Sequence, residues 1–140
     1  MNIYKLLYNK FPRQLAFPQR RLVENRKEFF ALINKYNGIK RVFASVYNYT
    51  GNPEFDALNL DVDKIFIDID GEEKSIEDAR KLFEYLSKKK YKFVILFSGG
   101  GFHFYIFTKG YKTLVNKKYS LLKSHLFFKN RVNINTVSYT

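Results

Sequence analysis

The sequence predicts an α+β fold, and three observations support this prediction. Segments with the alternation typical of strands are interspersed with segments of helical periodicity. Glycine and proline residues separate these segments, as expected for turns. With 140 residues, of which 46% are hydrophobic, the chain can form a hydrophobic core, which excludes a largely disordered chain. We therefore expect one domain over residues 1–140, with an α/β extension at 1–50 and a sheet-containing part at 60–140.

The extension at residues 1–50 contains two of the three prolines, which favours extended backbone and a short helix over residues 1–21. Apolar residues at helical spacing predict a helix over residues 21–38, and Gly38 is a suitable residue to end it. A strand is predicted over residues 40–48, followed by turn residues.

The second part alternates strands and helices more clearly. The predicted elements are a strand at 64–70, a helix at 75–90, strands at 91–97 and 102–107, a helix at 113–128 and a strand from residue 131. In the first helix, Ser75 is placed to cap the N-terminus, with Asp78 completing a capping box. Its predicted apolar stripe consists of Ile76, Ala79, Leu82, Phe83 and Leu86. The resulting order, βαββαβ, is the split unit of ferredoxin-like folds.

This topology brings three separate segments to one edge of the sheet. Helical crossovers leave the first two strands parallel, with the hairpin partner between them in the opposite direction. The end of the first strand, the turn at 98–101 and the start of the last strand near Asn133 then share an edge. We therefore expect Asp68 and Asp70, at the end of the first strand, to lie beside this turn.

The two aspartates suggest a metal site. Side chains alternate along a strand, so Asp68 and Asp70 point to the same face with Cα atoms roughly 7 Å apart. Such carboxylates repel each other unless a cation lies between them, and oxygen ligands favour Mg²⁺ or Mn²⁺. The alternative is two solvated aspartates at the end of a strand, because this short motif is weak evidence by itself.

The glycine turn that follows suggests an anion site. Glycines allow backbone N–H groups to approach a phosphate closely, and the neighbouring hydroxyl can add a hydrogen bond. The candidate phosphate-binding residues are Ser98, Gly99, Gly100, Gly101 and His103. The pattern is neither a Walker loop nor a dinucleotide fingerprint. His103, Tyr105 and Phe107 share a face, so we expect His103 near the aspartates; the alternative is a hydrogen-bonded histidine at a strand edge.

The distribution of charge indicates a polyanionic partner. The net charge is +12, and the last 56 residues contain no acid. Binding of DNA or RNA would release counterions, which favours such a partner. The candidate nucleic-acid-binding residues are Tyr105, Lys117, Lys118 and Lys123, the tyrosine as a base-stacking side chain. The alternative is a protein that is merely basic and soluble.

The sequence also excludes some classes of protein. It contains no cysteine, which excludes disulfides, a thiol nucleophile and a cysteine–zinc site. No apolar run approaches the roughly 20 residues that a membrane helix needs, and no signal peptide is recognisable. We therefore expect a cytoplasmic protein without a membrane partner.

The segments "VDKIFIDIDG" and "FSGGGFHFY" together resemble the archaeo-eukaryotic primase superfamily, most closely the small primase-polymerases of archaeal plasmids and viruses. The family carries an hhhDhD strand, where h is hydrophobic, and an sGxGxH turn and strand. Asp68 and Asp70 match the first motif without gaps. Ser98, Gly99, Gly101 and His103 match the second.

The resemblance implies an RRM-like palm and template-directed nucleotidyl transfer with two divalent metals in DNA replication. It assigns Asp68, Asp70 and His103 to catalysis, the aspartates as metal ligands. It implies a DNA template and primer, NTP or dNTP substrates, and further replication domains or a helicase as partners. The chain departs from the family where a third acid is expected, and Asn133 is the best positional match. We therefore expect either a palm truncated at Thr140 or a reduced form with weak or lost activity.

Two other functions fit the same residues. One is a non-catalytic RRM-like module that binds nucleic acid, which the amide at Asn133 favours. The other is a metal-dependent glycosyltransferase with a DxD motif, in which Asp68 and Asp70 hold a nucleotide-sugar through the ion. The latter does not predict a basic tail without carboxylates.

Overall fold

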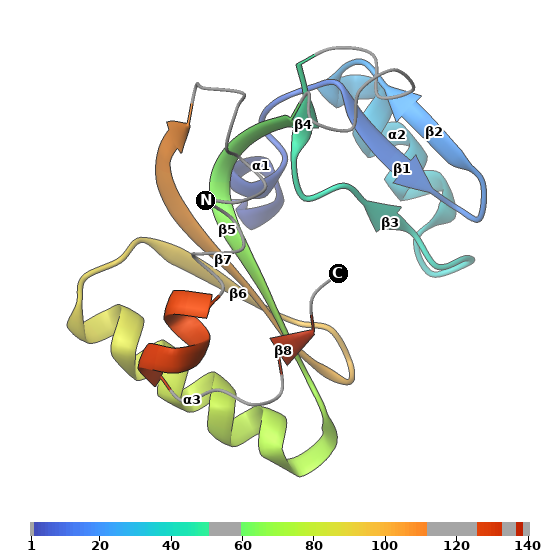
Figure 1. Cartoon of the computed structure of the whole chain (residues 1–140). Helices are drawn as coiled ribbons and strands as arrows, with labels where there is room; N and C mark the ends of the chain where they lie inside the picture. The colour runs from blue at the N-terminus through green and yellow to red at the C-terminus, as the bar shows by residue number, and fades with distance from the viewer. Residues whose placement is uncertain (1, 51–59, 112–125, 133–136, 139–140) are drawn as a thin grey trace. The chain divides into compact units, whose positions relative to one another are not determined.

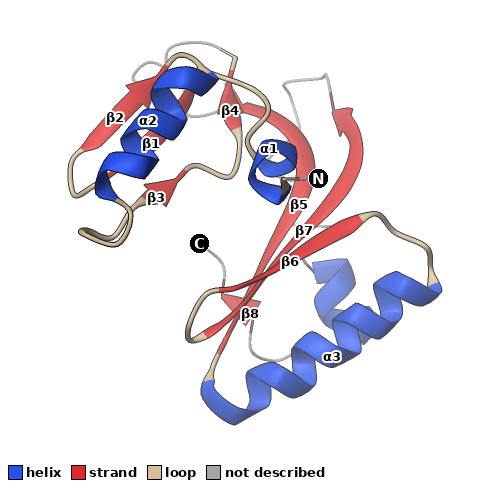
Figure 2. Ribbon diagram, turned by 180° about the vertical axis from the view of Figure 1, so that it is seen from behind, coloured by secondary structure: helices blue, strands red, loops and turns tan. Residues whose placement is uncertain are grey.

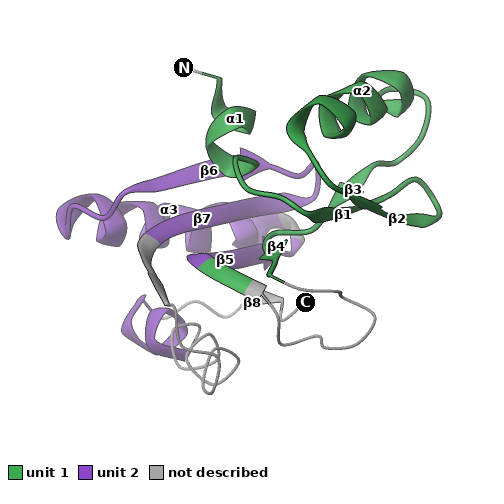
Figure 3. Cartoon of the chain, turned by 90° about the horizontal axis from the view of Figure 1, so that it is seen from above, with its two compact units in different colours: residues 1–62 green, residues 63–140 purple. Residues whose placement is uncertain are grey.

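A computed structural model describes residues 2–50, 60–111, 126–132 and 137–138 (Figure 1). In these residues the fold is mixed α+β, with two antiparallel sheets and four helices, which confirms the predicted class. Where the sequence suggests one domain, the chain divides into two compact units, residues 1–62 and 63–140 (Figure 3). None of the helices in the described ranges is long and apolar enough to cross a lipid bilayer.

The first unit contains a three-stranded sheet in the order β2-β1-β3. Its elements are α1 (Ile3–Leu7), β1 (Arg13–Ala16), β2 (Arg20–Val23), α2 (Arg26–Tyr36), β3 (Phe43–Ala44) and β4 (Asn48–Tyr49). Leu15, Val23 and Phe29 form its buried core. The predicted lead-in is therefore a short helix followed by an antiparallel hairpin, and the predicted helix is shorter because its first residues belong to β2.

Helix α2 begins and ends at residues that suit these positions. The side chain of Asn25 accepts a hydrogen bond from the N–H group of Glu28 at 3.0 Å, which satisfies one of the free donors of the first turn. Gly38 adopts a positive φ of 82° directly after the C-cap residue Asn37, a conformation that glycine adopts without strain.

The predicted continuous strand at residues 40–48 is wrong, because the chain bends between β3 and β4. At this bend the hydroxyl of Ser45 donates to the carbonyl of Tyr47 at 2.8 Å and accepts from the N–H of Gln14 at 3.1 Å. Such side-chain bonds compete with a regular ladder. Strands β3 and β4 consequently belong to different sheets, and β4 pairs with the first residues of β5.

Arg13 is a fully buried cation in the first unit. Its guanidinium lies 5.2 Å from the ring centroid of Tyr8. It donates to four carbonyl oxygens at 2.8–3.3 Å, those of Leu7, Lys10, Ser45 and Val46. The planar group therefore links the end of α1 to the bend before β4, because its five donors can serve several acceptors at once.

The second unit follows the predicted order of strands and helices (Figure 1). Its elements are β5 (Leu60–Asp70, which begins in the first unit), α3 (Glu72–Lys88), β6 (Phe93–Phe97), β7 (Gly101–Tyr111), a helix at residues 126–132 and β8 (Val137–Ser138). Strand β7 lies between β5 and β6, and β8 pairs with β5. Most of the predicted helix at 113–128 falls outside the described residues. The strand predicted from residue 131 is wrong at its start, because 131 and 132 are helical.

The sheet of the second unit has one face packed against helices (Figure 2). Alternate residues of β5 and β7 point to this face and meet α3 and Phe128 in the core. The buried strand residues are Ile65, Ile67, Ile69, Phe104 and Ile106. The residues between them, including Asp68 and His103, therefore occupy the opposite face, as the alternation predicts.

Helix α3 differs from its prediction at its start and on its buried face. It begins at Glu72, Gly71 occupies the N-cap position, and no side chain caps it. The predicted capping box is wrong, because Ser75 lies inside the first turn and is buried. The apolar stripe is also partly wrong. Ile76 and Phe83 are 56% and 48% exposed, whereas the buried residues are Ser75, Asp78, Ala79, Leu82 and Leu86.

Candidate metal and phosphate site

An acidic residue and a histidine from neighbouring strands lie together on the face of the sheet opposite α3. The Nε2 atom of His103, on β7, lies 3.3 Å from Oδ1 of Asp68, on β5. Their side chains are 30% and 15% exposed. The ring of Phe66 contacts His103 edge-on, with ring centroids 5.2 Å apart, which orients the imidazole. The sequence-predicted neighbourhood of Asp68 and His103 is thus present.

The environment of Asp68 disfavours its negative charge. Burial raises the pKa of the Asp68 carboxyl above its ordinary value of 3.8; His103 lowers the pKa, and the neighbouring Asp70 raises it. The Oδ1 atom is buried and has no hydrogen-bond partner among the described residues, because the contact with His103 is within ion-pair range but lacks hydrogen-bond geometry. A bound cation would satisfy this oxygen and offset the repulsion between the two aspartates.

The turn between β6 and β7 is stabilised by two internal hydrogen bonds. The N–H of Ser98 donates to the carbonyl of Gly101 at 3.0 Å, and the N–H of Gly101 donates to Oγ of Ser98 at 3.1 Å. Gly99 has a positive φ of 95°. Of the three glycine amides predicted to bind phosphate, that of Gly101 is therefore used within the turn, where it donates to the predicted Ser98 hydroxyl. The exposed amides of Gly99 and Gly100 have no backbone partner in the part of the chain described, and so are the donors available to an anion.

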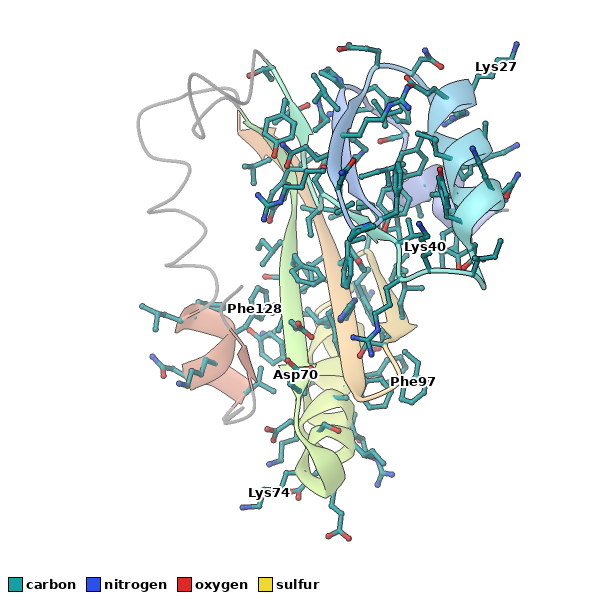
Figure 4. The ribbon with its side chains drawn as sticks, turned by 90° about the vertical axis from the view of Figure 1, so that its right-hand side faces the viewer. Lys27, Lys40, Asp70, Lys74, Phe97 and Phe128 are labelled. Atoms are coloured by element: carbon teal, nitrogen blue, oxygen red, sulfur yellow. The ribbon has the colours of Figure 1, made fainter. Side chains whose placement is uncertain are left out.

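Gly101 holds the turn against the end of β5. A Cβ atom at this position would lie 2.0 Å from the carbonyl oxygen of Ile69 and 3.2 Å from Cα of Asp70. Only a glycine permits so close an approach of two backbones. Figure 4 accordingly shows Asp70 at the same end of the sheet as Phe97, the last residue of β6. The predicted convergence of the turn and the acidic strand end is therefore present, through a contact that the sequence did not reveal.

The last strand also reaches this end of β5. Asp68 is paired with Ser138 and Ile69 with Val137 in antiparallel register. The predicted third ligand position, Asn133, lies outside the described residues, as do Lys117, Lys118 and Lys123. Across the described ranges, no three His, Asp or Glu side chains are grouped closely enough to hold one metal ion. The described donors for Mg²⁺ or Mn²⁺ are therefore the two aspartates, whose oxygen chemistry fits these ions.

The aromatic residues of this face differ in how much surface they offer. Tyr105 is only 5% exposed, and its ring centroid lies 5.1 Å from that of Phe66. Little of the Tyr105 ring is therefore accessible for stacking on a base. Phe97 is 71% exposed at the edge of the turn, with its ring centroid 5.6 Å from that of Phe102. Sequence reasoning did not select Phe97, although its position directly before Ser98 was a usable signal.

The geometry of Asp68, Asp70, His103 and the glycine turn is the basis for any functional assignment. Comparison with protein-family models, with curated proteins and with solved structures finds no match to this chain.

Proposed function

We propose that this chain is a primase-polymerase catalytic domain that performs template-directed nucleotidyl transfer. The observation that carries the proposal is the 3.3 Å approach of His103 Nε2 to Asp68 Oδ1, beside a glycine turn packed on the same strand end. An acidic pair that needs a cation lies next to donors that suit a phosphate. This combination is the arrangement that a metal-bound nucleoside triphosphate requires.

Each residue has a distinct role in this proposal. Asp68 and Asp70 hold the divalent ion, which supplies charge neutralisation for the triphosphate and the attacking 3′-oxygen. The amides of Gly99 and Gly100 donate to phosphate oxygens, while the internal hydrogen bonds of Ser98 keep the turn in shape. His103 donates from its ring to the same triphosphate, because it faces the aspartates and is 30% exposed.

The strand order supports the corresponding fold. The order β8-β5-β7-β6, with a helix after the first and third of these strands along the chain, is the order of a ferredoxin-like or RRM-like palm. Within the proposal, the first unit is the N-terminal α/β extension of that palm. The packed face supports the sheet from behind, and the opposite face carries the site.

The partners follow from the charge of the chain. A net charge of +12 suits a DNA template and primer, because neutralisation of phosphates releases counterions. NTP or dNTP is the substrate, and further replication domains or a helicase are the expected protein partners. The proposal places this activity in the cytoplasm, in an archaeal, plasmid or viral replication system.

The test is nucleotide incorporation on a primed DNA template with Mg²⁺ or Mn²⁺. The Asp68→Asn/Asp70→Asn variant should lose incorporation by at least about a hundredfold, because its carboxamides bring no negative charge to the ions. Glu84→Gln, an exposed acid-to-amide change on α3, is the matched control and should retain activity. Equal incorporation by the double variant and the wild type would refute the proposed roles of the aspartates.

A non-catalytic nucleic-acid-binding module is the second candidate. The observation that favours it is that no three His, Asp or Glu side chains in the described segments are grouped so that they could hold one metal ion. This function predicts DNA binding that is equal in EDTA and in Mg²⁺, with no incorporation by the wild type. Metal-dependent incorporation by the wild type would exclude it.

A further inference from the structure

We propose that the first unit contains a separate binding site for the base of a nucleotide. This inference is independent of the proposed catalytic function, because every residue that carries it belongs to residues 2–50. The site is a cavity of about 360 Å³, within the range of small-molecule sites. Three asparagines and three aromatic residues line most of it: Asn2, Tyr4, Tyr8, Phe30, Asn34 and Asn37. We call it the amide–tyrosine cavity.

The chemistry of this cavity fits a planar, uncharged and polar group. None of its lining residues is charged. A carboxamide presents a donor and an acceptor side by side, which matches the edge of a nucleobase. Aromatic rings bind the flat face of any base by stacking. An aliphatic ligand would make no hydrogen bonds with the amides of Asn34 and Asn37, which are exposed, and a charged ligand would find no opposite charge in the cavity.

Part of the wall is held in place by its own packing. The ring of Tyr8 lies 5.1 Å from Phe29 and under the guanidinium of Arg13 at 5.2 Å. Phe30 meets the same Phe29 ring edge-on at 5.3 Å. Tyr4, by contrast, is 53% exposed, so its ring is accessible to a ligand. A rigid wall with one accessible ring reduces the entropy lost on binding.

The part of the chain that forms the cavity is basic, which favours a nucleotide over an uncharged heterocycle. Lys5, Lys35 and Arg41 are exposed and directly follow or precede lining residues in the chain. Residues 1–50 contain ten lysines and arginines but only two acids, Glu24 and Glu28. Neutral amides inside and cations outside match a base with its phosphate attached.

The experiment is a titration of the full chain with AMP, CMP, GMP and UMP in EDTA, in which binding is measured by NMR. It uses the Asp68→Asn/Asp70→Asn background, so binding at the proposed catalytic site is not measured. We expect saturable binding of at least one monophosphate. Tyr4→Ala and Asn34→Ala should each weaken it at least about fivefold, since stacking and paired hydrogen bonds are lost. Asn9→Ala changes an exposed asparagine outside the lining and should leave the affinity unchanged.

A second arm identifies the source of the nucleotide. A short single-stranded oligodeoxynucleotide that binds much more tightly than any monophosphate supports a site for a nucleic-acid strand. Equal affinities support a site for free nucleotides. Tyr4→Phe, which keeps the ring, should retain binding, and the dispersed NMR spectrum expected of Tyr4→Ala shows that its loss of binding is not due to unfolding. The inference is overturned if no probe binds, or if binding is the same in Tyr4→Ala, Asn34→Ala and Asn9→Ala.

Discussion

The Nε2 atom of His103 lies 3.3 Å from the Oδ1 atom of Asp68, on adjacent strands of one sheet. The imidazole lowers the pKa of this carboxyl, whereas burial and Asp70 raise it, and burial has the largest effect. The protonation of Asp68 therefore depends on both neighbours, in opposite directions. Since metal binding requires the carboxylate form, the same neighbours affect the affinity for a cation.

The first prediction concerns the pKa of Asp68 in the metal-free protein. His103→Ala should raise this pKa further, because it removes the group that favours the carboxylate. Asp70→Asn should lower it, because it removes a like charge. A ¹³C NMR titration of the Asp68 carboxyl in EDTA measures both changes. Glu84→Gln should leave the titration curve in place, and shifts of the same sign in the first two variants would contradict the prediction.

The second prediction concerns the pH dependence of stability. Because the folded-state pKa of Asp68 is raised, the folded protein holds this proton over a pH range in which the unfolded chain has released it. The resulting stabilisation is present below the ordinary pKa of 3.8 and is lost as pH rises through the raised pKa. The Asp68→Asn variant does not lose this stabilisation, because asparagine does not titrate. In EDTA its Tm, relative to wild type, should therefore increase as pH rises through this window and then remain higher.

Thermal unfolding at a series of pH values checks this second prediction. Addition of Mg²⁺ at neutral pH should raise the Tm of the wild type and not that of Asp68→Asn, since binding to the folded state stabilises it. The prediction is contradicted if, in EDTA, the Tm of Asp68→Asn minus that of the wild type decreases as pH rises.

The third prediction compares two neighbouring glycines. Gly101→Ala places a Cβ atom 2.0 Å from the carbonyl oxygen of Ile69, so the backbone must move. We expect a loss of about 2–4 kcal/mol in the free energy of unfolding. Gly100→Ala meets no atom within 4 Å and should change it by less than about 0.5 kcal/mol. Urea denaturation of both variants is the measurement, and equal effects would show that the close approach is not required.

The fourth prediction concerns the buried cation of the first unit. Arg13→Met removes the donors to four carbonyl oxygens and should cost about 3–5 kcal/mol of unfolding free energy. Arg13→Lys should also destabilise, because an ammonium cannot reproduce the planar arrangement of donors. Arg20→Met, at an exposed position of β2, is the matched control and should be nearly neutral. Chemical denaturation would contradict the prediction if Arg13→Met and Arg20→Met had the same midpoint.

The fifth prediction tests the buried face of α3. Leu82→Ala should cost about 2–5 kcal/mol, because this side chain is fully buried in the core of the second unit. Ile76→Ala should cost less than about 1 kcal/mol, because Ile76 is 56% exposed. The two free energies of unfolding come from the same denaturation assay. A larger loss for Ile76→Ala than for Leu82→Ala would contradict this prediction and support the apolar stripe that the sequence suggested.

The sheet of the second unit was largely predictable from the sequence. Alternation along β5 and β7 separates two faces because a strand has a strict period of two, so Ile67 and Asp68 point in opposite directions. The antiparallel hairpin and the pairing of β8 with β5 follow from the order of the elements. The neighbourhood of Asp68 and His103 was predictable for the same reason.

Features that depend on tertiary contacts were not predictable. Ser75 looked like a helix cap, but β5 ends at Asp70 and α3 begins at Glu72, with Gly71 at the N-cap position. The bend at Ser45 depends on one hydrogen bond to Tyr47, two residues later, and on another from Gln14 of β1. The steric role of Gly101 depends on Ile69, which is 32 positions earlier in the chain. Local propensity contains no information about such contacts.

Strand β5 sets a limit on how the molecule can be divided for separate expression. Leu60 and Asp61 pair with β4, while Asp68 and Ile69 pair with β8. The eleven-residue strand β5 is therefore paired with a different strand at each of its ends. A cut between residues 62 and 63, the boundary of the two units, would sever an unbroken strand and leave unpaired backbone groups on each fragment. Fragments that end within β5 are therefore expected to aggregate.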